Sequence, residues 1–224
     1  DTTYIVRDTG SATTKYLQTD QTWDVTTATF TMAQLGGNVN GTTTIGLATN
    51  TLHLISVAAV NGDYVTSTYG AIATGVYTYA AVPSAPTVTS TAVNTLKVIV
   101  NAGTNPTTAS TTFIVRDTGS ATIKYLQVDQ TWGVATATFN YNQLGGATGT
   151  TTVGLATNTL HTIDIAAVNG DSMQTTTYST AASLYTLADV PGVSTVTSTN
   201  AQTMKVIVNS STNPADTTYI VRDT

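Results

Sequence analysis

Apolar and polar side chains alternate in several short segments of the chain. The residues that share one face of the clearest segment are Leu96, Val98 and Val100. A later segment alternates in the same way through His161, Ile163, Ile165 and Ala167. A spacing of two residues is the side-chain period of a β-strand. These segments therefore predict strands with one face directed toward a core, and Lys97 and Asn101 belong to the opposite face.

Turn-forming residues separate the predicted strands. Asp117–Ser120 and Asn169–Asp171 have the composition of tight turns, in which Gly119 and Gly170 are expected to supply a positive φ. Thr makes up about a quarter of the chain and strong helix formers are scarce. Seven or eight short strands in about 108 residues predict an all-β protein of the sandwich type.

The chain also repeats itself. Residues 1–9 and 216–224 both read DTTYIVRDT, and residues 110–118 read STTFIVRDT. A period near 108 residues is the size of a domain, so tandem sandwiches are expected. Residues 83–190 are predicted to form a complete sandwich, residues 1–82 the later strands of one, and residues 191–224 the first strands of the next. The chain would then be cut inside a domain at both ends, and its last part would complete the first part of a following copy.

Charge and composition argue against several classes of function. The net charge is −5 and the seven basic residues are scattered, which argues against nucleic-acid binding. No apolar run is long enough to predict a membrane span. The absence of cysteine rules out disulfides. The Thr-rich composition without glutamate favours an extracellular location on a microbial cell surface.

The strand order resembles that of fibronectin type III domains. The resemblance is carried by the Pro entry, by Leu96–Val100, by Phe113 and Val115, and by Gly154–Asn169. It implies tandem fibronectin type III-like or other immunoglobulin-like sandwiches. Three features depart from the family: Val100 and Val208 replace its tryptophan, His53 and His161 replace its corner tyrosine, and the segment Ala137–Thr148 is long. Trp132 is expected to fill the space of the missing tryptophan, and another immunoglobulin-like family remains an alternative.

The histidines and the two Asp-Thr-Gly-Ser segments are interpreted as structural rather than catalytic. His53 and His161 lack Glu, Cys or further His at ligand spacing, so they predict buried, neutral corner residues that donate to nearby backbone, without metal or cofactor. Asp8-Thr9-Gly10-Ser11 and its copy from Asp117 resemble the aspartic-protease motif. That chemistry needs two carboxylates sharing a proton, so turns are predicted instead, and no catalytic residue or enzyme activity is expected.

Apolar residues also occur where a solvent-facing sheet should be polar. Ile99 lies between inward residues, and other isoleucines lie beside inward valines. Such repeated apolar positions predict a contact between domains or chains. The isoleucines are Ile5, Ile99, Ile114, Ile207 and Ile220.

These features predict a structural role in an extracellular filament, sheath or surface layer. The expected partner is the protein itself, joined head-to-tail and in lateral contacts. A continuous polypeptide and strand-exchanging subunits are both open at this point. The alternative is an adhesin whose loops bind a glycan or a protein.

Overall fold

The computed structural model describes residues 2–72, 74–175 and 177–223. It contains two compact units. The first comprises Asp1–Ala81, Thr104–Thr112 and Ala167–Thr176, and the second comprises Val82–Gly103, Phe113–Ala166 and Thr177–Thr224. Almost all regular structure is antiparallel β-strand, with one short α-helix and one short 3₁₀ helix among the described residues. The prediction of an all-β protein is confirmed.

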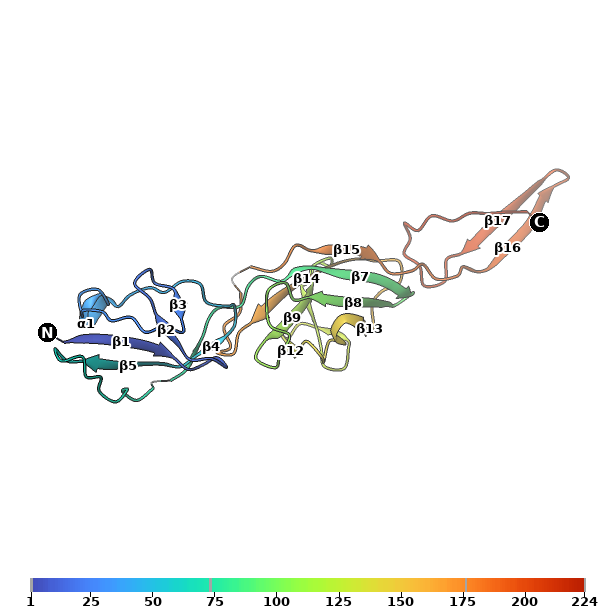
Figure 1. Ribbon diagram of the computed structural model, residues 1–224. Helices are drawn as coiled ribbons and strands as arrows, with labels where there is room; N and C mark the ends of the chain where they lie inside the picture. The colour runs from blue at the N-terminus through green and yellow to red at the C-terminus, as the bar shows by residue number, and fades with distance from the viewer. Residues whose placement is uncertain (1, 73, 176, 224) are drawn as a thin grey trace. The chain divides into compact units, whose positions relative to one another are not determined.

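The first unit contains a four-stranded antiparallel sheet of order β3-β2-β1-β5 (Figure 1). Its strands are β1 (Thr3–Asp8), β2 (Lys15–Leu17), β3 (Trp23–Asp24) and β5 (Ile55–Val60). A second, two-stranded sheet pairs β4 (Leu52–His53) with β6 (Val76–Tyr77), and α1 spans Gly37–Asn40. The core of this unit includes Val6, Leu17 and Phe30.

The central repeat, residues 83–190, contains two sheets (Figure 1). The larger has the order β11-β10-β9-β14-β15, with β12 paired to β9. Its strands are β9 (Thr112–Asp117), β10 (Lys124–Leu126), β11 (Trp132–Gly133), β12 (Phe139–Asn140), β14 (Leu160–Val168) and β15 (Ala182–Tyr185). The smaller has the order β13-β8-β7, formed by β7 (Ser84–Ala92), β8 (Thr95–Asn101) and β13 (Thr150–Thr152), and η1 spans Gly146–Thr148.

Both sheets of the central repeat contribute to one apolar core. The alternation predicted for β8 is confirmed, because Leu96, Val98 and Val100 are at most 2% exposed whereas Asn101 is exposed. The larger sheet supplies further fully buried side chains, among them Phe113, Val115, Leu126, Ile163 and Ile165. Two antiparallel sheets that share a core form a β-sandwich. The central repeat is therefore a β-sandwich, the class of fold expected from the sequence.

The last part of the chain forms a single hairpin. Strands β16 (Gly192–Asn200) and β17 (Thr203–Asn209) pair only with each other. Within the described part of the chain after Asn209, up to residue 223, no further strand is present. Among the described residues, no second sheet pairs with this hairpin, and its apolar face lines a groove together with residues 219–223.

The prediction for the isoleucines is wrong for Ile5 and Ile114. They are 7% and 3% exposed, so they are buried within the chain and are not outward-facing. The reason is that β1 and β9 are inner strands of their sheets and both of their faces are covered, which the alternation of the sequence does not reveal. Ile99 is half-buried, and a Cβ on Gly149 would approach its Cγ1 to 2.5 Å. Ile207 and Ile220 are 49% and 97% exposed.

The turns also differ from the prediction in their backbone. Gly119 and Gly170 do not have a positive φ; in the Asn169 turn it is Ser172 that has a φ of 64°. Glycine at position 119 is required by space instead, because a Cβ there would lie 2.7 Å from the Leu160 carbonyl oxygen. The Asp117 side chain bonds to its own turn, since Oδ1 accepts from the Gly119 amide at 2.9 Å.

Candidate assembly site

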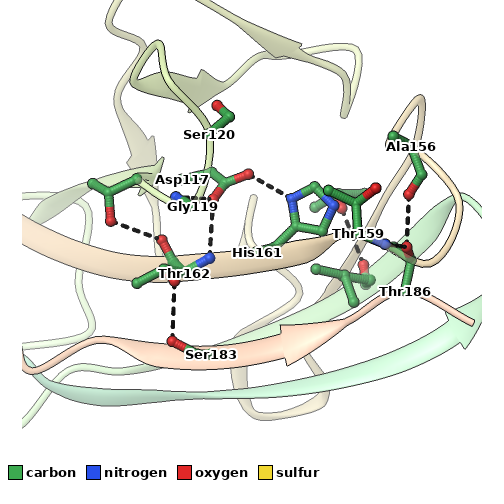
Figure 2. A network of polar contacts seen from close by, with 12 residues as sticks. Asp117, Gly119, Ser120, Ala156, Thr159, His161, Thr162, Ser183 and Thr186 are labelled. Atoms are coloured by element: carbon green, nitrogen blue, oxygen red, sulfur yellow. Dashed lines mark hydrogen bonds and ion pairs between the residues drawn. The ribbon is translucent and has the colours of Figure 1, made fainter. Parts of the chain in front are cut away.

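A carboxylate joins the end of β9 to β14 in the central repeat. Asp117 Oδ2 lies 2.6 Å from His161 Nδ1. Asp117 Oδ1 accepts hydrogen bonds from the amides of Gly119 and Thr162, at 2.9 and 3.0 Å (Figure 2). All three donors belong to the same corner, so the aspartate fixes the turn, the ring and the neighbouring strand together.

The electrostatics of the corner favour an ionised aspartate. Burial acts to raise the pKa of the Asp117 carboxyl, but the hydrogen bonds from His161, Gly119 and Thr162 outweigh burial and lower that pKa below its ordinary value. A carboxylate can only accept, so the proton shared with His161 is carried by Nδ1. No described residue offers a hydrogen-bond partner to the buried Nε2 of this ring.

The first unit contains the same corner. Asp8 Oδ2 lies 2.5 Å from His53 Nδ1, and Asp8 Oδ1 accepts from the amides of Gly10 and Leu54. His161 is buried and His53 is nearly so. The predicted backbone partner is wrong for both rings, because the partner is the side chain of an aspartate. The sequence contains a signal for this pair, since each D-T-G-S is followed by a histidine at almost the same separation.

The hydrogen bonds of each aspartate stay within its own corner, where three donors engage it. Among the described residues, no group of three His, Cys, Asp or Glu side chains is arranged to hold a metal ion. The geometry is that of a structural brace between strands.

A second feature of the first unit is an apolar groove of about 890 Å³. Its lining includes Leu17, Trp23, Leu47, Ile55 and Val76. Ile55 is 38% exposed, whereas its counterpart in the central repeat, Ile163, is fully buried. The groove therefore exposes a surface that the complete sandwich covers.

The hairpin β7–β8 covers this surface in the central repeat. Leu96 and Val98 are fully buried there, and β8 pairs with β13 so that Thr151 lies opposite Lys97. In the first unit, residues 42–44 have the same sequence as Thr150–Thr152 but form no strand. The acceptor face is defined here as the groove residues Thr42–Thr44, Leu47 and Ile55 together with Val57, which is exposed on the same face of β5 as Ile55.

The β16–β17 hairpin carries the complementary exposed surface. Val196, Met204 and Val206 are 56%, 65% and 40% exposed. Their counterparts in the central repeat, Val88, Leu96 and Val98, are half-buried or fully buried. We call Val196, Met204, Val206 and Val208 the donor face. The sequence predicted that residues 191–224 complete the later strands formed by residues 1–82, but it did not identify the acceptor- or donor-face residues as the contact.

Comparison with known proteins gives little further information. No family model matches the chain, and no curated protein matches it. Among solved structures, the chain is similar to the FN1–FN3 domains of chicken CNTN1, with 14% sequence identity and a TM-score of 0.36. The match covers 83% of this chain and 56% of that chain, so this chain spans little more than half of the structure that it matches. The assignment of the fold rests on the sheets and core described above. Within the described residues, no helix has the length and apolar character needed to cross a membrane.

Proposed function

We propose that this protein is a structural component of a microbial extracellular filament, sheath or surface layer, built from β-sandwich repeats joined head-to-tail. The observation that carries the proposal is the presence of two exposed apolar surfaces on one chain. The acceptor face exposes Ile55 and Val57, at 38% and 40%. The donor face exposes Val196 and Met204, at 56% and 65%. In the central repeat the counterparts Ile163, Ile165 and Leu96 are fully buried, and Val88 is half-buried.

Association through these faces would be open-ended. The donor face and the acceptor face are different surfaces, so the contact is heterologous, and a heterologous contact that does not close on itself generates a filament. Removing the exposed apolar side chains of both faces from water also favours association. Each added copy presents both a new donor face and a new acceptor face.

Repeated hydrogen bonds at the linkers support a regular assembly. The Asn105 side chain donates to the Ala81 carbonyl and accepts from the Ala81 amide, both at 2.8 Å. Asn213 makes the same pair of bonds with Asp189, at 2.8 and 2.7 Å. The linker is thus clamped in the same way in both copies, and a repeated linker conformation is what a periodic polymer requires.

The extracellular location rests on composition. The chain has no cysteine, few charged residues and a threonine content of about a quarter. Domains of the fibronectin type III class are commonly extracellular, which agrees with this composition. Weakly charged, threonine-rich surfaces also approach one another with little electrostatic repulsion.

The test of the proposal is the state of association of the purified chain. Sedimentation velocity at increasing concentration, combined with negative-stain microscopy, should show species that lengthen with concentration and appear as strings of beads. A Met204→Asp/Val206→Asp variant is the matched control and should remain monomeric. A wild-type protein that stays monomeric at every concentration would contradict the structural role.

An adhesin is the second candidate, and one observation favours it. The loop after Asn61 differs between copies: Tyr64 is 90% exposed, whereas Ser172 stands at its position in the central repeat. An exposed aromatic ring is a suitable platform for a sugar face or for a peptide side chain. Binding of the chain to a glycan array that is lost in Tyr64→Ala but kept in Ser172→Ala would support this role.

A further inference from the structure

The second strands of the two copies of the first hairpin are almost the same in sequence. β8 reads TLKVIVN and β17 reads TMKVIVN, so they differ only at Leu96 and Met204. Each hairpin also has the same internal register, with Val88 opposite Val98 and Val196 opposite Val206. The irregularities of pairing fall at equivalent positions in both. The β16–β17 hairpin therefore already has the conformation that β7–β8 has inside a complete sandwich.

The acceptor segment is also conserved between the two copies. Residues 41–44 and 149–152 both read GTTT. In the central repeat this segment is β13, in which Thr150, Thr151 and Thr152 lie opposite Val98, Lys97 and Leu96. In the first unit the segment has no ladder partner among the described residues and is irregular. The sequence is suited to a strand, and only the partner strand is missing.

We propose that the β16–β17 hairpin of a second copy docks on the acceptor face in the register of β8 with β13. Thr42, Thr43 and Thr44 then pair antiparallel with Val206, Lys205 and Met204 of the second copy. This inference rests on the proposed head-to-tail role and adds to it the partner surface and the residue register. Because the hairpin is preformed, little conformational entropy is lost on docking.

The docked arrangement satisfies the groups that are unpaired or exposed in the free chain. Thr152 Oγ1 donates to the Leu96 carbonyl at 3.2 Å in the central repeat, and Thr44 Oγ1 would do the same with the Met204 carbonyl of the second copy. Met204 and Val206 enter the groove over Ile55 and Val57. The methionine side chain is unbranched and flexible, so Met204 can adapt its shape to an irregular groove on another chain.

The side of the hairpin that carries Lys205 faces away from the groove. Lys97, its counterpart, is half-buried while Leu96 and Val98 on either side are fully buried. Position 205 therefore tests register without disturbing apolar packing. Antiparallel residues that lie directly opposite have Cα atoms about 4.5–5.5 Å apart, a separation that a disulfide can span.

The test is a pair of single-cysteine chains, since the natural sequence has no cysteine to interfere. A Thr43→Cys chain is mixed with a Lys205→Cys chain under mild oxidation, and the products are separated on a non-reducing gel. We expect a covalent heterodimer that forms at least about 10-fold faster than the products of Thr43→Cys mixed with Lys97→Cys. The double variant Thr151→Cys/Lys97→Cys is the positive control, and should form an intramolecular disulfide because that pair is adjacent within one chain.

A second variant separates docking from folding. Val206→Asp places a carboxylate in the apolar groove and should weaken association by at least about 100-fold. Lys205→Gln changes the solvent side and should leave association within a factor of about two. Circular dichroism and thermal unfolding of both variants as monomers should match those of the wild-type chain, since Val206 is already 40% exposed.

The outcomes distinguish the inference from the proposed function. Filaments without the Thr43–Lys205 cross-link would overturn the register while the structural role survives. A cross-link within one Thr43→Cys/Lys205→Cys chain would overturn docking by a second copy. A specific cross-link from a protein that forms only dimers would support the register and contradict the filament.

Discussion

Strands β8 and β17 differ by one residue and have very different surroundings. Leu96 and Val98 of β8 are fully buried, whereas Met204 and Val206 of β17 are 65% and 40% exposed. Both strands nevertheless form the same hairpin with the same register. The hairpin is therefore specified by residues close together in sequence, and its burial depends on a second sheet from a distant part of a repeat.

A second pair of segments, residues 42–44 and Thr150–Thr152, has a structure that depends on its surroundings. Their sequences are the same, but only the segment that meets β8 becomes a strand. A strand cannot satisfy its backbone groups alone, because each ladder bond needs a partner. One segment of the repeat is thus locally determined, and the other adopts its structure only on contact.

The largest expected effect is the loss of a buried side chain in the central repeat. Leu96→Ala should lower the free energy of unfolding by about 2–5 kcal/mol, because it leaves a cavity in a packed core. Met204→Ala should change it by less than about 0.5 kcal/mol, because that side chain is solvated. The measurement is urea denaturation followed by Trp132 fluorescence in a Trp23→Phe background, at a concentration where copies do not associate. Equal effects of the two substitutions would show that β17 is already covered.

Two glycines give the next contrast. Gly149 has a φ of 74°, and a Cβ there would lie 2.5 Å from the Val98 carbonyl oxygen. Gly41 has a φ of 65° and nothing within 4 Å. Gly149→Ala should destabilise by about 2–4 kcal/mol from strain and overpacking, and Gly41→Ala by about 1 kcal/mol from strain alone. Thermal unfolding of the monomers measures this, and Gly41→Ala should also weaken association, since docking would bring β17 to the same position.

Acid should destabilise the two corners. The pKa values of Asp8 and Asp117 are lowered in the folded protein: burial alone would raise them, but their hydrogen bonds prevail. The stabilisation is present above the unfolded pKa of about 3.9 and is lost as the pH falls through the folded pKa. Asp117→Asn should cost about 1–3 kcal/mol at neutral pH and should flatten the dependence of stability on pH below about 4. Unfolding curves measured between neutral and acid pH test this prediction. If the free energy of unfolding of the variant falls with pH as steeply as that of the wild type, the loss of stability in acid comes from other carboxylates.

The smallest expected effect comes from the arginine beside each corner. Arg116 makes a bidentate pair with Asp164, at 2.6 and 2.9 Å, whereas Arg7 donates to Ser56 Oγ, at 2.9 Å. Ser56→Asp should recreate the pair and stabilise the first unit by up to about 1 kcal/mol. Ser56→Asn is the control that lacks the charge. Thermal unfolding in low and high salt measures the gain, and a gain that persists in high salt would not be ionic.

The strands and the repeat could be predicted from sequence because they depend on local patterns. The alternation through Leu96, Val98 and Val100 identified an inward face, and the structure buries it. The burial of Ile5 and Ile114 could not be predicted in the same way. A strand buried on both faces can have the same local sequence as a strand with one solvent-exposed face. Whether the second face is buried depends on segments that are distant in the sequence.

The candidate site was predicted only in part. Two histidines at equivalent positions pointed to a structural corner, but their aspartate partners lie more than 40 residues earlier in the chain. The sequence predicted that residues 191–224 complete the part formed by residues 1–82, but not which residues form the acceptor face. Its residues have ordinary core composition, and only the exposure of Ile55 and Val57 in the folded chain distinguishes it.

Met204 gives the donor face a chemical sensitivity that β8 does not have. Leu96 cannot be oxidised under mild conditions, but a methionine that is 65% exposed can become a sulfoxide. The added oxygen is polar, so an oxidised hairpin would enter the apolar groove poorly, while a docked one would be shielded from the oxidant. Met204 would then be open to oxidation in the free subunit and shielded from it in the assembled one. The rate at which free subunits lose the ability to join, and the resistance of the assembly to oxidation, would both depend on this sulfur atom.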